Sequence, residues 1–292
     1  MIGPWGGWDR EASRSGALAR DAKLVIGGGE VSAMIRYEVD SPVTTLTLSR
    51  PPVNAMDYEF VTALNAALDR IEVESPTLVV IRSDQKCFCA GADLNLIRGF
   101  LTSHAGIEQM VSYVQSLHSV FNRLEALEAV TLCAIDGAAL GGGLELTLAC
   151  DLRLATPRAK IGLPEARVGQ IPGAGGTQRL TRLAGPGVAA RLILGAEIVD
   201  GPEAARLGIV QWACASEALD AKIQEIATRV AGLSRGPLVA AKRCMAAWFD
   251  PALDGFAMEI ETPRTLMRTE EARRFVNAFF NRNETAERRG RP

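Results

Sequence analysis

The order of apolar and polar positions predicts two strands, a helix and a third strand near the start of the chain. Residues 34–39 and 44–48 alternate apolar and polar side chains or are rich in β-branched ones, and the turn-forming Asp40-Ser-Pro42 separates them, which is typical of a hairpin. From Asp57 onward apolar residues recur at helical spacing, at Phe60, Val61, Leu64, Leu68 and Ile71. The apolar run Leu78-Val-Val-Ile81 then predicts a short buried strand.

The same alternation of strands and helices continues along the chain. A second amphipathic helix carries one apolar face, formed by Met110, Val111, Val114, Leu117, Phe121 and Leu124. It leads into a predicted strand at residues 130–135. Further short strands are expected at 152–155 and 159–162, and helices dominate from Thr177 onward. Gly185-Pro186 is interpreted as the end of one helix and the start of the next.

This pattern predicts an α/β core of repeated ββα units over residues 33–198, followed by a helical C-terminal region over residues 199–292. Residues 1–32 show no periodicity that would bury a face, so we expect them to form a flexible N-terminal extension. Two interpretations of the extension stay open. It is either a transit peptide, against which its acidic residues argue, or an over-extended start of the reading frame.

Composition narrows the classes of function that the chain can have. Of its 292 residues, 48% are hydrophobic and 23% are charged, which is ordinary for a globular protein. The formal net charge is −2 and no long basic run occurs, so nucleic acid is not an expected partner. No apolar run approaches the roughly 18 residues that span a bilayer, so a membrane is not an expected partner either.

The cysteines and histidines argue for a reducing compartment and against a metal site. The six cysteines stand mostly in apolar runs without CxxC spacing, as expected for buried, reduced thiols in the cytoplasm. Cys87 and Cys89 have the wrong spacing for a structural zinc site, and the chain has only two histidines. One of these, His118, flanks an apolar helical stripe and is interpreted as a packing residue. We therefore expect no metal centre.

A glycine turn is the first candidate for binding chemistry. Gly141-Gly-Gly143 follows a buried strand and precedes Leu144-Glu-Leu-Thr-Leu-Ala-Cys150, which contains good helix formers. Such a turn presents unpaired backbone N–H groups to a ligand. The alternative is a tight turn that simply needs positive φ. A phosphate loop is excluded, because no lysine-serine or lysine-threonine pair follows the glycines.

Two glutamates are candidates for acid/base chemistry. Glu145 falls one turn into the predicted helix among leucines, where apolar surroundings would raise its pKa toward neutrality, as a group that takes and gives a proton requires. Glu165 follows an apolar strand, and Pro164 fixes its approach. Each carboxylate alone could be structural, and their spacing does not show that they face each other. Together, beside a turn of N–H donors, they favour acid/base catalysis.

A second candidate for N–H donors is the small-residue loop Cys89-Ala-Gly-Ala-Asp93, which follows a predicted strand. Its small side chains let the backbone come close to a ligand. Paired with the amide of Gly142, the amide of Ala92 could form a two-donor oxyanion hole.

Taken together, these segments resemble the crotonase, or enoyl-CoA hydratase/isomerase, superfamily. The resemblance runs from about Ile35 to Arg282 and rests on several specific motifs. The motifs are Cys89-Ala-Gly-Ala-Asp-Leu94, Asp136-Gly-Ala-Ala-Leu-Gly-Gly-Gly-Leu-Glu145, Ala149-Cys-Asp151, Gly162-Leu-Pro-Glu165 and Gly169-Gln-Ile-Pro-Gly-Ala-Gly-Gly-Thr-Gln-Arg-Leu180. The resemblance implies a crotonase-like spiral of ββα repeats with a helical C-terminal trimerisation region. It also implies a homo-oligomer, either a trimer or a dimer of trimers.

The resemblance further implies the chemistry. Members bind acyl-CoA thioesters without a metal or redox cofactor and stabilise a thioester enolate. By position, the amides of Ala92 and Gly142 match the oxyanion hole. Glu145 matches the glutamate that positions or deprotonates water, and Glu165 matches the one that exchanges the proton at the α carbon. The residues expected to contact substrate or CoA are Pro52, Val53, Ala90, Ala92, Asp93, Leu94, Pro172, Gly173, Phe279 and Arg282.

Having both glutamates favours an enoyl-CoA hydratase of fatty-acid β-oxidation, which adds water syn to a trans-2-enoyl-CoA and gives a 3-hydroxyacyl-CoA. Two alternatives stay open. Residues 50–57 look more like those of Δ3-Δ2-enoyl-CoA isomerases, and a non-catalytic acyl-CoA-binding protein would keep the same fold. RNA binding, known in one branch, is set aside because the helix at 103–127 has only Arg123 as a base.

Two positions depart from the family pattern. Asn95 stands where many relatives carry a lysine, and Phe275 stands where a glycine is common. These departures bear on the contacts to the CoA phosphates and on the acyl channel. The length, branching and aromaticity of the acyl chain are expected to depend on the segment from about Leu96 to Tyr113.

Overall fold

The computed structural model describes residues 34–289, with side chains described as far as Asn281. The expected extension at residues 1–32 lies outside the described residues. The strands are β1 (Ile35–Asp40), β2 (Val43–Leu48), β3 (Leu78–Ser83), β4 (Val130–Ile135), β5 (Ala138–Leu140), β6 (Leu152–Ala155), β7 (Lys160–Gly162), β8 (Ile198–Val199) and β9 (Trp212–Ala213). The α-helices are α1 (Tyr58–Glu74), α2 (Leu94–Phe100), α3 (His104–Ala126), α4 (Gly142–Leu148), α5 (Gly176–Ile193), α6 (Gly201–Arg206), α7 (Leu219–Ala231), α8 (Arg235–Ala247), α9 (Gly255–Leu266) and α10 (Glu270–Arg289). Two 3₁₀ helices are η1 (Glu165–Val168) and η2 (Ser216–Ala218).

The strands form two sheets. The larger has the order β1-β2-β3-β4-β6-β9, and the smaller has the order β5-β7-β8. β1 and β2 pair antiparallel, with Ile35 opposite Leu48 and Asp40 opposite Val43, which confirms the predicted hairpin. From β2 to β9 the neighbouring strands of the larger sheet are parallel. Helices therefore have to cross over the sheet between its strands.

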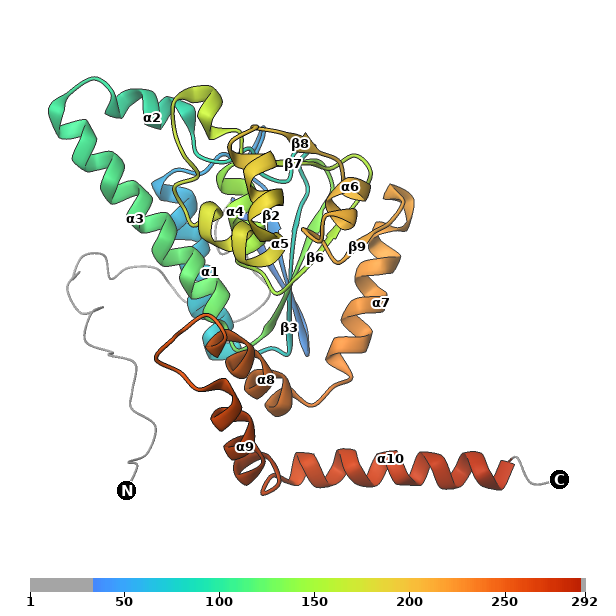
Figure 1. Ribbon diagram of the computed structural model, residues 1–292. Coiled ribbons are helices and arrows are strands. Elements are labelled where there is room, and N and C mark those ends of the chain that lie inside the picture. The colour runs from blue at the N-terminus through green and yellow to red at the C-terminus, as the bar shows by residue number, and fades with distance from the viewer. Residues whose placement is uncertain (1–33, 290–292) are drawn as a thin grey trace, which may run out of the picture.

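Both faces of the larger sheet are buried. In β3, Val79 and Ile81 join an apolar cluster that includes residues of α1 and α3, whereas Leu78 and Val80 join a second cluster that includes residues of α7. Successive residues of a strand point to opposite faces, so a strand that is buried on both faces has a continuous apolar run. Figure 1 shows α1 and α3 on one side of the sheet and α7 on the other.

The first helix begins where the sequence predicts it. The side chain of Asp57 caps α1 by accepting a hydrogen bond of 2.9 Å from the N–H of Phe60. All five apolar positions of the predicted stripe are buried in the core. α1 therefore packs on the sheet through the face that the periodicity predicts.

Parallel pairing decides where the candidate loops lie. β3 and β4 run side by side, so the loops that follow them leave the same edge of the sheet. The N–H of Cys89 donates to the carbonyl of Ala138 at 2.9 Å, and the N–H of Leu140 donates to the carbonyl of Cys89 at 3.0 Å. The loop after β3 is thereby held against β5, next to the glycine turn.

Some elements are not evident from the sequence. β5 has three residues and α2 has seven, which is too short for a periodicity to show. Within the region expected to be helical, β9 adds a strand to the edge of the larger sheet by pairing with β6. α5 is interrupted at Gly185, where φ is 82° and ψ is 162°, so the predicted break at Gly185-Pro186 is confirmed. Among the described residues, no helix combines the length and the apolarity that a membrane span requires.

Candidate active site

Glu145 lies in the first turn of α4 and is only 2% exposed. Its Oε1 accepts hydrogen bonds from the N–H groups of Ala174 and Gly176, each at 2.7 Å. Both amides belong to the turn that leads into α5. Two donors on one oxygen fix the orientation of the carboxylate. Its other oxygen, Oε2, accepts no hydrogen bond from the described part of the protein, and is left for another partner.

Glu165 is the first residue of η1 and follows Pro164. Its Oε1 lies 3.0 Å from the position that a Cβ would take on Gly141, so the carboxyl points at the glycine turn. Its Oε2 is buried and has no hydrogen-bond partner among the described residues. Buried polar atoms without a partner are rare in folded proteins, and a functional role is one established reason for them.

Burial changes the acidity of both carboxyls, and the charge of Glu165 acts on Glu145. Burial raises the pKa of Glu145 to about 7, and the nearby charge of Glu165 raises it as well, while the amides of Gly176 and Ala174 and the charge of Arg179 oppose the rise. Burial also raises the pKa of Glu165. A carboxyl with the pKa of Glu145 can take and give a proton near neutral pH, as the sequence predicts for this residue.

The two predicted oxyanion donors lie side by side. The nitrogen of Ala92 is 3.6 Å from the position of a Cβ on Gly142, and the nitrogen of Gly142 is 3.1 Å from that of a Cβ on Gly91. Within the part of the chain that the structure describes, neither N–H group has a protein acceptor. The two amides can therefore bind one oxygen that carries negative charge.

The glycine turn satisfies both interpretations that the sequence allows. Gly141 has a φ of 54°, which favours glycine, and the turn also brings the Gly142 N–H to the site. Gly91 has a φ of 95°, and a Cβ there would lie 2.8 Å from the carbonyl of Leu140. The absence of side chains at these positions lets the two donor segments come into contact.

A neighbouring segment holds the donor loop in place. The N–H of Met56 donates to the carbonyl of Gly91 at 2.8 Å, and the N–H of Asp93 donates to the carbonyl of Met56 at 2.7 Å. The hydroxyl of Tyr113, on α3, donates to the same carbonyl of Met56 at 2.8 Å. These bonds fix the loop on either side of Ala92, so its N–H keeps one direction.

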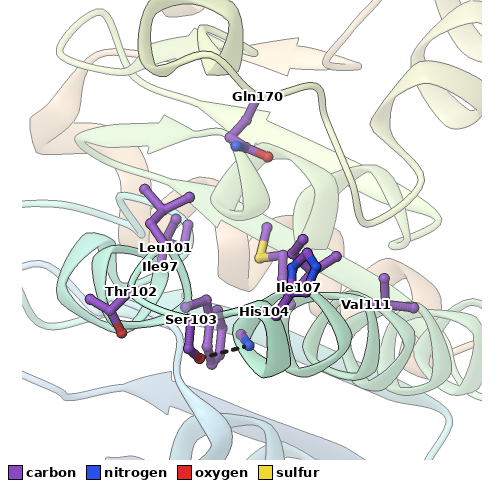
Figure 2. A pocket seen from close by; sticks show the side chains of 11 residues that line it. Ile97, Leu101, Thr102, Ser103, His104, Ile107, Val111 and Gln170 are labelled. Atoms are coloured by element: carbon purple, nitrogen blue, oxygen red, sulfur yellow. Dashed lines mark hydrogen bonds between the residues drawn. The ribbon is translucent and has the colours of Figure 1, made fainter.

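A cavity of about 480 Å³ lies between α2, the start of α3 and the loop after η1. Its lining is Ile97, Phe100, Leu101, Thr102, Ser103, His104, Gly106, Ile107, Met110, Val111 and Gln170. Figure 2 shows Gln170 reaching toward this space from the side opposite α2 and α3. The N–H of Gln170 donates to the carbonyl of Glu165 at 3.0 Å, which connects the cavity wall to the acid. Most of the lining therefore comes from the segment 96–113, on which the specificity for the acyl chain is expected to depend.

The remaining predicted contact residues fall into two groups. Around the donor loop, the N–H of Ala90 donates to the carbonyl of Val53 at 3.0 Å, and Pro52, Ala90 and Leu94 are exposed. Asp93 caps α2 by accepting from the N–H of Asn95 at 2.8 Å. On the opposite side, Pro172 is buried, and a Cβ on Gly173 would lie 3.5 Å from Val114 of α3. Contact of these residues with CoA stays a prediction.

Phe279 and Arg282 are not brought to the glutamates within one chain. Both lie on α10, which extends away from the body at its base (Figure 1). The side chain of Phe279 is 57% exposed. The side chain of Arg282 lies outside the described residues, and its role stays a prediction.

Sequence reasoning missed several residues of the site. Ala174 and Gly176 donate to Glu145, and Arg179 supports their turn, yet only Pro172 and Gly173 of this segment are expected to have a role. A glycine-rich turn ahead of a helix is a signal for backbone donors, and it could have identified them.

All six cysteines are unpaired, and no group of His, Cys, Asp and Glu side chains within residues 34–281 is arranged to hold a metal ion.

Comparison with known proteins assigns the site to a family. Residues 38–286 match the family model described as enoyl-CoA hydratase/isomerase. The chain belongs to the enoyl-CoA hydratase/isomerase family. The resemblance to the crotonase superfamily that the motifs indicate is thereby confirmed.

Relatives in this family carry hydratase names. The chain is 33% identical to the short-chain-enoyl-CoA hydratase of Clostridium acetobutylicum over 85% of its own length and 94% of that protein. It is 35% identical to the crotonyl-CoA hydratase of Syntrophomonas wolfei, over 70% of the chain and 77% of the relative. It is 41% identical to the "Probable enoyl-CoA hydratase 2, mitochondrial" of Arabidopsis thaliana, of which it spans 65%.

Solved structures of the family share the fold. An enoyl-CoA hydratase from Geobacillus kaustophilus superposes with a TM-score of 0.80 at 28% identity, over 86% of this chain and 95% of that one. An enoyl-CoA hydratase from Bacillus anthracis superposes with a TM-score of 0.79 at 31% identity, over 85% and 96%. The expected crotonase fold is thereby confirmed.

Proposed function

We propose that this chain adds water reversibly to the double bond of a trans-2-enoyl-CoA and gives a 3-hydroxyacyl-CoA. The observation that carries the proposal is the pair of buried carboxyls, Glu145 and Glu165, beside two N–H groups that have no acceptor among the described residues. The chain matches enoyl-CoA hydratases along most of its length, and these relatives indicate the type of enzyme. The chain is an enoyl-CoA hydratase.

The geometry suggests a role for each group. Glu145, ionised and held by two amides, takes a proton from water as the water oxygen bonds to carbon 3 of the substrate. The electron pair of the double bond moves toward the thioester oxygen, where the N–H groups of Ala92 and Gly142 stabilise the negative charge. Glu165, in its protonated form, gives its proton to carbon 2. Exchange with solvent then resets the two carboxyls, so that water has been added without oxidation or reduction.

The mainly apolar cavity between α2 and α3 fits the acyl chain of the substrate, and one residue of its wall, Gln170, is hydrogen-bonded to the backbone of Glu165. Its walls include Phe100, Ile107 and Met110, and it opens next to the loop that carries the acid. An acyl chain bound there would bury apolar surface at about 25 cal/mol per Å². We therefore place the acyl chain between α2 and α3, with the thioester at the two amides.

The class of reaction indicates which cofactors the enzyme needs. Addition of water leaves the oxidation state of the substrate unchanged, so we propose that no redox cofactor or metal takes part. We further propose a cytoplasmic enzyme of fatty-acid β-oxidation. The six unpaired cysteines support a reducing compartment.

We also propose that the chain works as a homotrimer or a dimer of trimers. Its C-terminal helices expose many large apolar side chains: Met245, Trp248, Phe249, Leu253, Phe256, Ile260, Met267, Val276, Phe279 and Phe280. Apolar surface on this scale is typical of an interface between proteins. A neighbouring chain would cover it, and could bring Phe279 and Arg282 to a substrate.

The proposal is tested by the loss of the conjugated enoyl-thioester absorbance when purified protein meets short and medium trans-2-enoyl-CoA. Glu145→Gln and Glu165→Gln should each lower kcat by about 10²- to 10⁴-fold, since each removes a group that moves a proton. Glu217→Gln, at an exposed position on η2, is the matched control and should keep the activity of the wild type.

Other outcomes of this assay would change the assignment. Conversion of a 3-enoyl-CoA that needs Glu165 alone, with no hydration at any chain length, would make the chain an isomerase, as the likeness of residues 50–57 suggests. No turnover in either assay, with acyl-CoA still bound, would indicate a binding protein.

A further inference from the structure

Arg179 is a buried charge on α5 that the proposed reaction does not use. Its residue is 7% exposed, and each of its three guanidinium nitrogens donates to a polar partner. Nη2 lies 2.8 Å from the carboxylate of Glu125 and 2.7 Å from the side-chain oxygen of Asn122, both on α3, and Nε donates to Glu125 at 3.0 Å. A buried guanidinium with this many partners has one fixed position.

The same guanidinium holds the turn that binds Glu145. Its Nη1 donates to the carbonyl of Ala174 at 3.0 Å. A Cβ on Gly175, where φ is 101°, would lie 2.2 Å from this nitrogen, so the turn wraps closely around the charge. The two residues that flank Gly175 are Ala174 and Gly176, whose N–H groups donate to Glu145 at 2.7 Å. One residue therefore fixes the turn that fixes the carboxylate.

Few charged groups face Glu145. The acid of Glu165, on η1, disfavours its charge, and Arg179, on α5, favours it. From α3, the imidazole of His118 lies 3.8 Å from the position of a Cβ on Gly175. Glu125, also on α3, is paired with Arg179. The guanidinium is thus the permanent positive charge that faces the carboxylate within the described residues.

We propose that Arg179 is a positioning residue for Glu145, because its guanidinium holds the turn at residues 174–176 in the conformation that binds one oxygen of that carboxylate. Its charge favours the ionised form that accepts a proton. Its bonds to Glu125 and Asn122 also connect this turn to α3, which lines the acyl cavity. The inference rests on the proposed role of Glu145 in the reaction.

The test is the pH dependence of hydration by Arg179→Gln. Loss of the positive charge should move the acidic limb of kcat/KM to higher pH, because Glu145 then needs a higher pH to ionise. A looser turn should also lower kcat by about 10- to 100-fold at the optimum, with KM nearly unchanged. Arg179→Lys keeps the charge and should return the limb toward the position of the wild type.

A second measurement does not depend on catalysis. Infrared spectra over a pH series report the C=O stretch of protonated buried carboxyls, and the band of Glu145 is the one absent from Glu145→Gln. This band should persist to higher pH in Arg179→Gln than in the wild type. If Glu145→Gln hydrates as fast as the wild type, the proposed function fails, and the infrared titration still decides the role of Arg179.

Two controls separate positioning from a general loss of fold. Arg182→Gln removes an exposed arginine from the same helix and should leave both the pH limb and the infrared band unchanged. Glu125→Gln keeps the guanidinium but removes its ion pair with α3, and should lower kcat without moving the limb to higher pH. If the limb and the band of folded Arg179→Gln coincide with those of the wild type, the proposal is wrong. If Arg179→Gln does not fold, Arg179→Lys and Glu125→Gln test the proposal in its place. A kcat equal to that of the wild type in both variants would overturn the proposal.

Discussion

Glu145 is buried in a helix whose other side chains contact the apolar core, and two N–H groups offset only part of the cost of its charge. Burial raises its pKa to about 7, whereas a glutamate in an unfolded chain has a pKa of about 4.3. The folded state therefore holds the proton more tightly than the unfolded state does. Stability is lost as the pH rises between these two values.

This difference predicts the stability of Glu145→Gln. Glutamine cannot ionise, so the variant does not lose this stability as the pH rises. The difference in free energy of unfolding, variant minus wild type, should therefore increase by about 3 kcal/mol from pH 4 to pH 8. Urea unfolding at several pH values and one protein concentration would measure the trend. Parallel curves for the two proteins would show that the carboxyl of Glu145 is not perturbed.

For single residues, the sequence identifies the candidate acids but not the contacts that hold them in place. Glu145 and Glu165 could be predicted because acids among apolar residues are unusual. The role of Arg179 could not, because an arginine in a helix is ordinarily a solvent-facing residue. Its partners on α3 lie more than fifty positions away in the chain, and only the folded structure brings them together.

Among the elements, α4 depends on one close contact with the donor loop. A Cβ on Gly143 would lie 2.1 Å from the carbonyl of Cys89, which itself accepts the N–H of Leu140. No side chain can occupy this space while α4 and the loop keep their contact. The orientation of the Gly142 N–H therefore depends on the absence of a side chain at the next residue.

Gly143→Ala should separate α4 from the loop. Overpacking of this kind costs about 1–3 kcal/mol of stability, and kcat should fall because the two oxyanion donors move apart. Gly187→Ala, on α5, is the matched control, since nothing lies within 4 Å of its added methyl group. It should keep activity and gain up to about 1 kcal/mol from helix propensity. Thermal unfolding and hydration rates would compare the two, and equal behaviour would contradict the close contact.

For the whole molecule, the C-terminal helices leave the body and expose apolar side chains at its base (Figure 1). On α9, Phe256 is 77% exposed and Ile260 is 72% exposed. Large apolar residues at this exposure are stable in water when another surface covers them. A homo-oligomer would supply that surface from copies of the same helices.

Phe256→Asp combined with Ile260→Asp should therefore convert an oligomer into single chains. Light scattering on a sizing column would give the mass of each species. Val73→Asp, at an 86% exposed position at the end of α1, is the control and should leave the mass unchanged. A wild-type protein with the mass of one chain would contradict the proposed trimer or dimer of trimers.

What the sequence by itself determined is local. Apolar periodicity predicted the hairpin, α1, α3 and the strands at 78–81 and 130–135, because burial of one face selects side chains every second or every third to fourth position. The glycine turn and the small-residue loop predicted where backbone donors would occur. The motifs predicted the family, and through it the enzyme type.

What the tertiary structure decided is how distant segments meet. Glu145 and Glu165 are separated by β6 and β7, and Ala92 and Gly142 by α2, α3, β4 and β5, so no local pattern records that they face each other. Parallel pairing of β3 with β4 places the loops that follow them at one edge of the larger sheet, and pairing of β5 with β7 places the glycine turn next to the segment that carries Glu165. Burial there changes the acidity of both carboxyls. Backbone N–H groups carry no side-chain signature, so only the folded chain shows which of them remain free to bind an oxyanion.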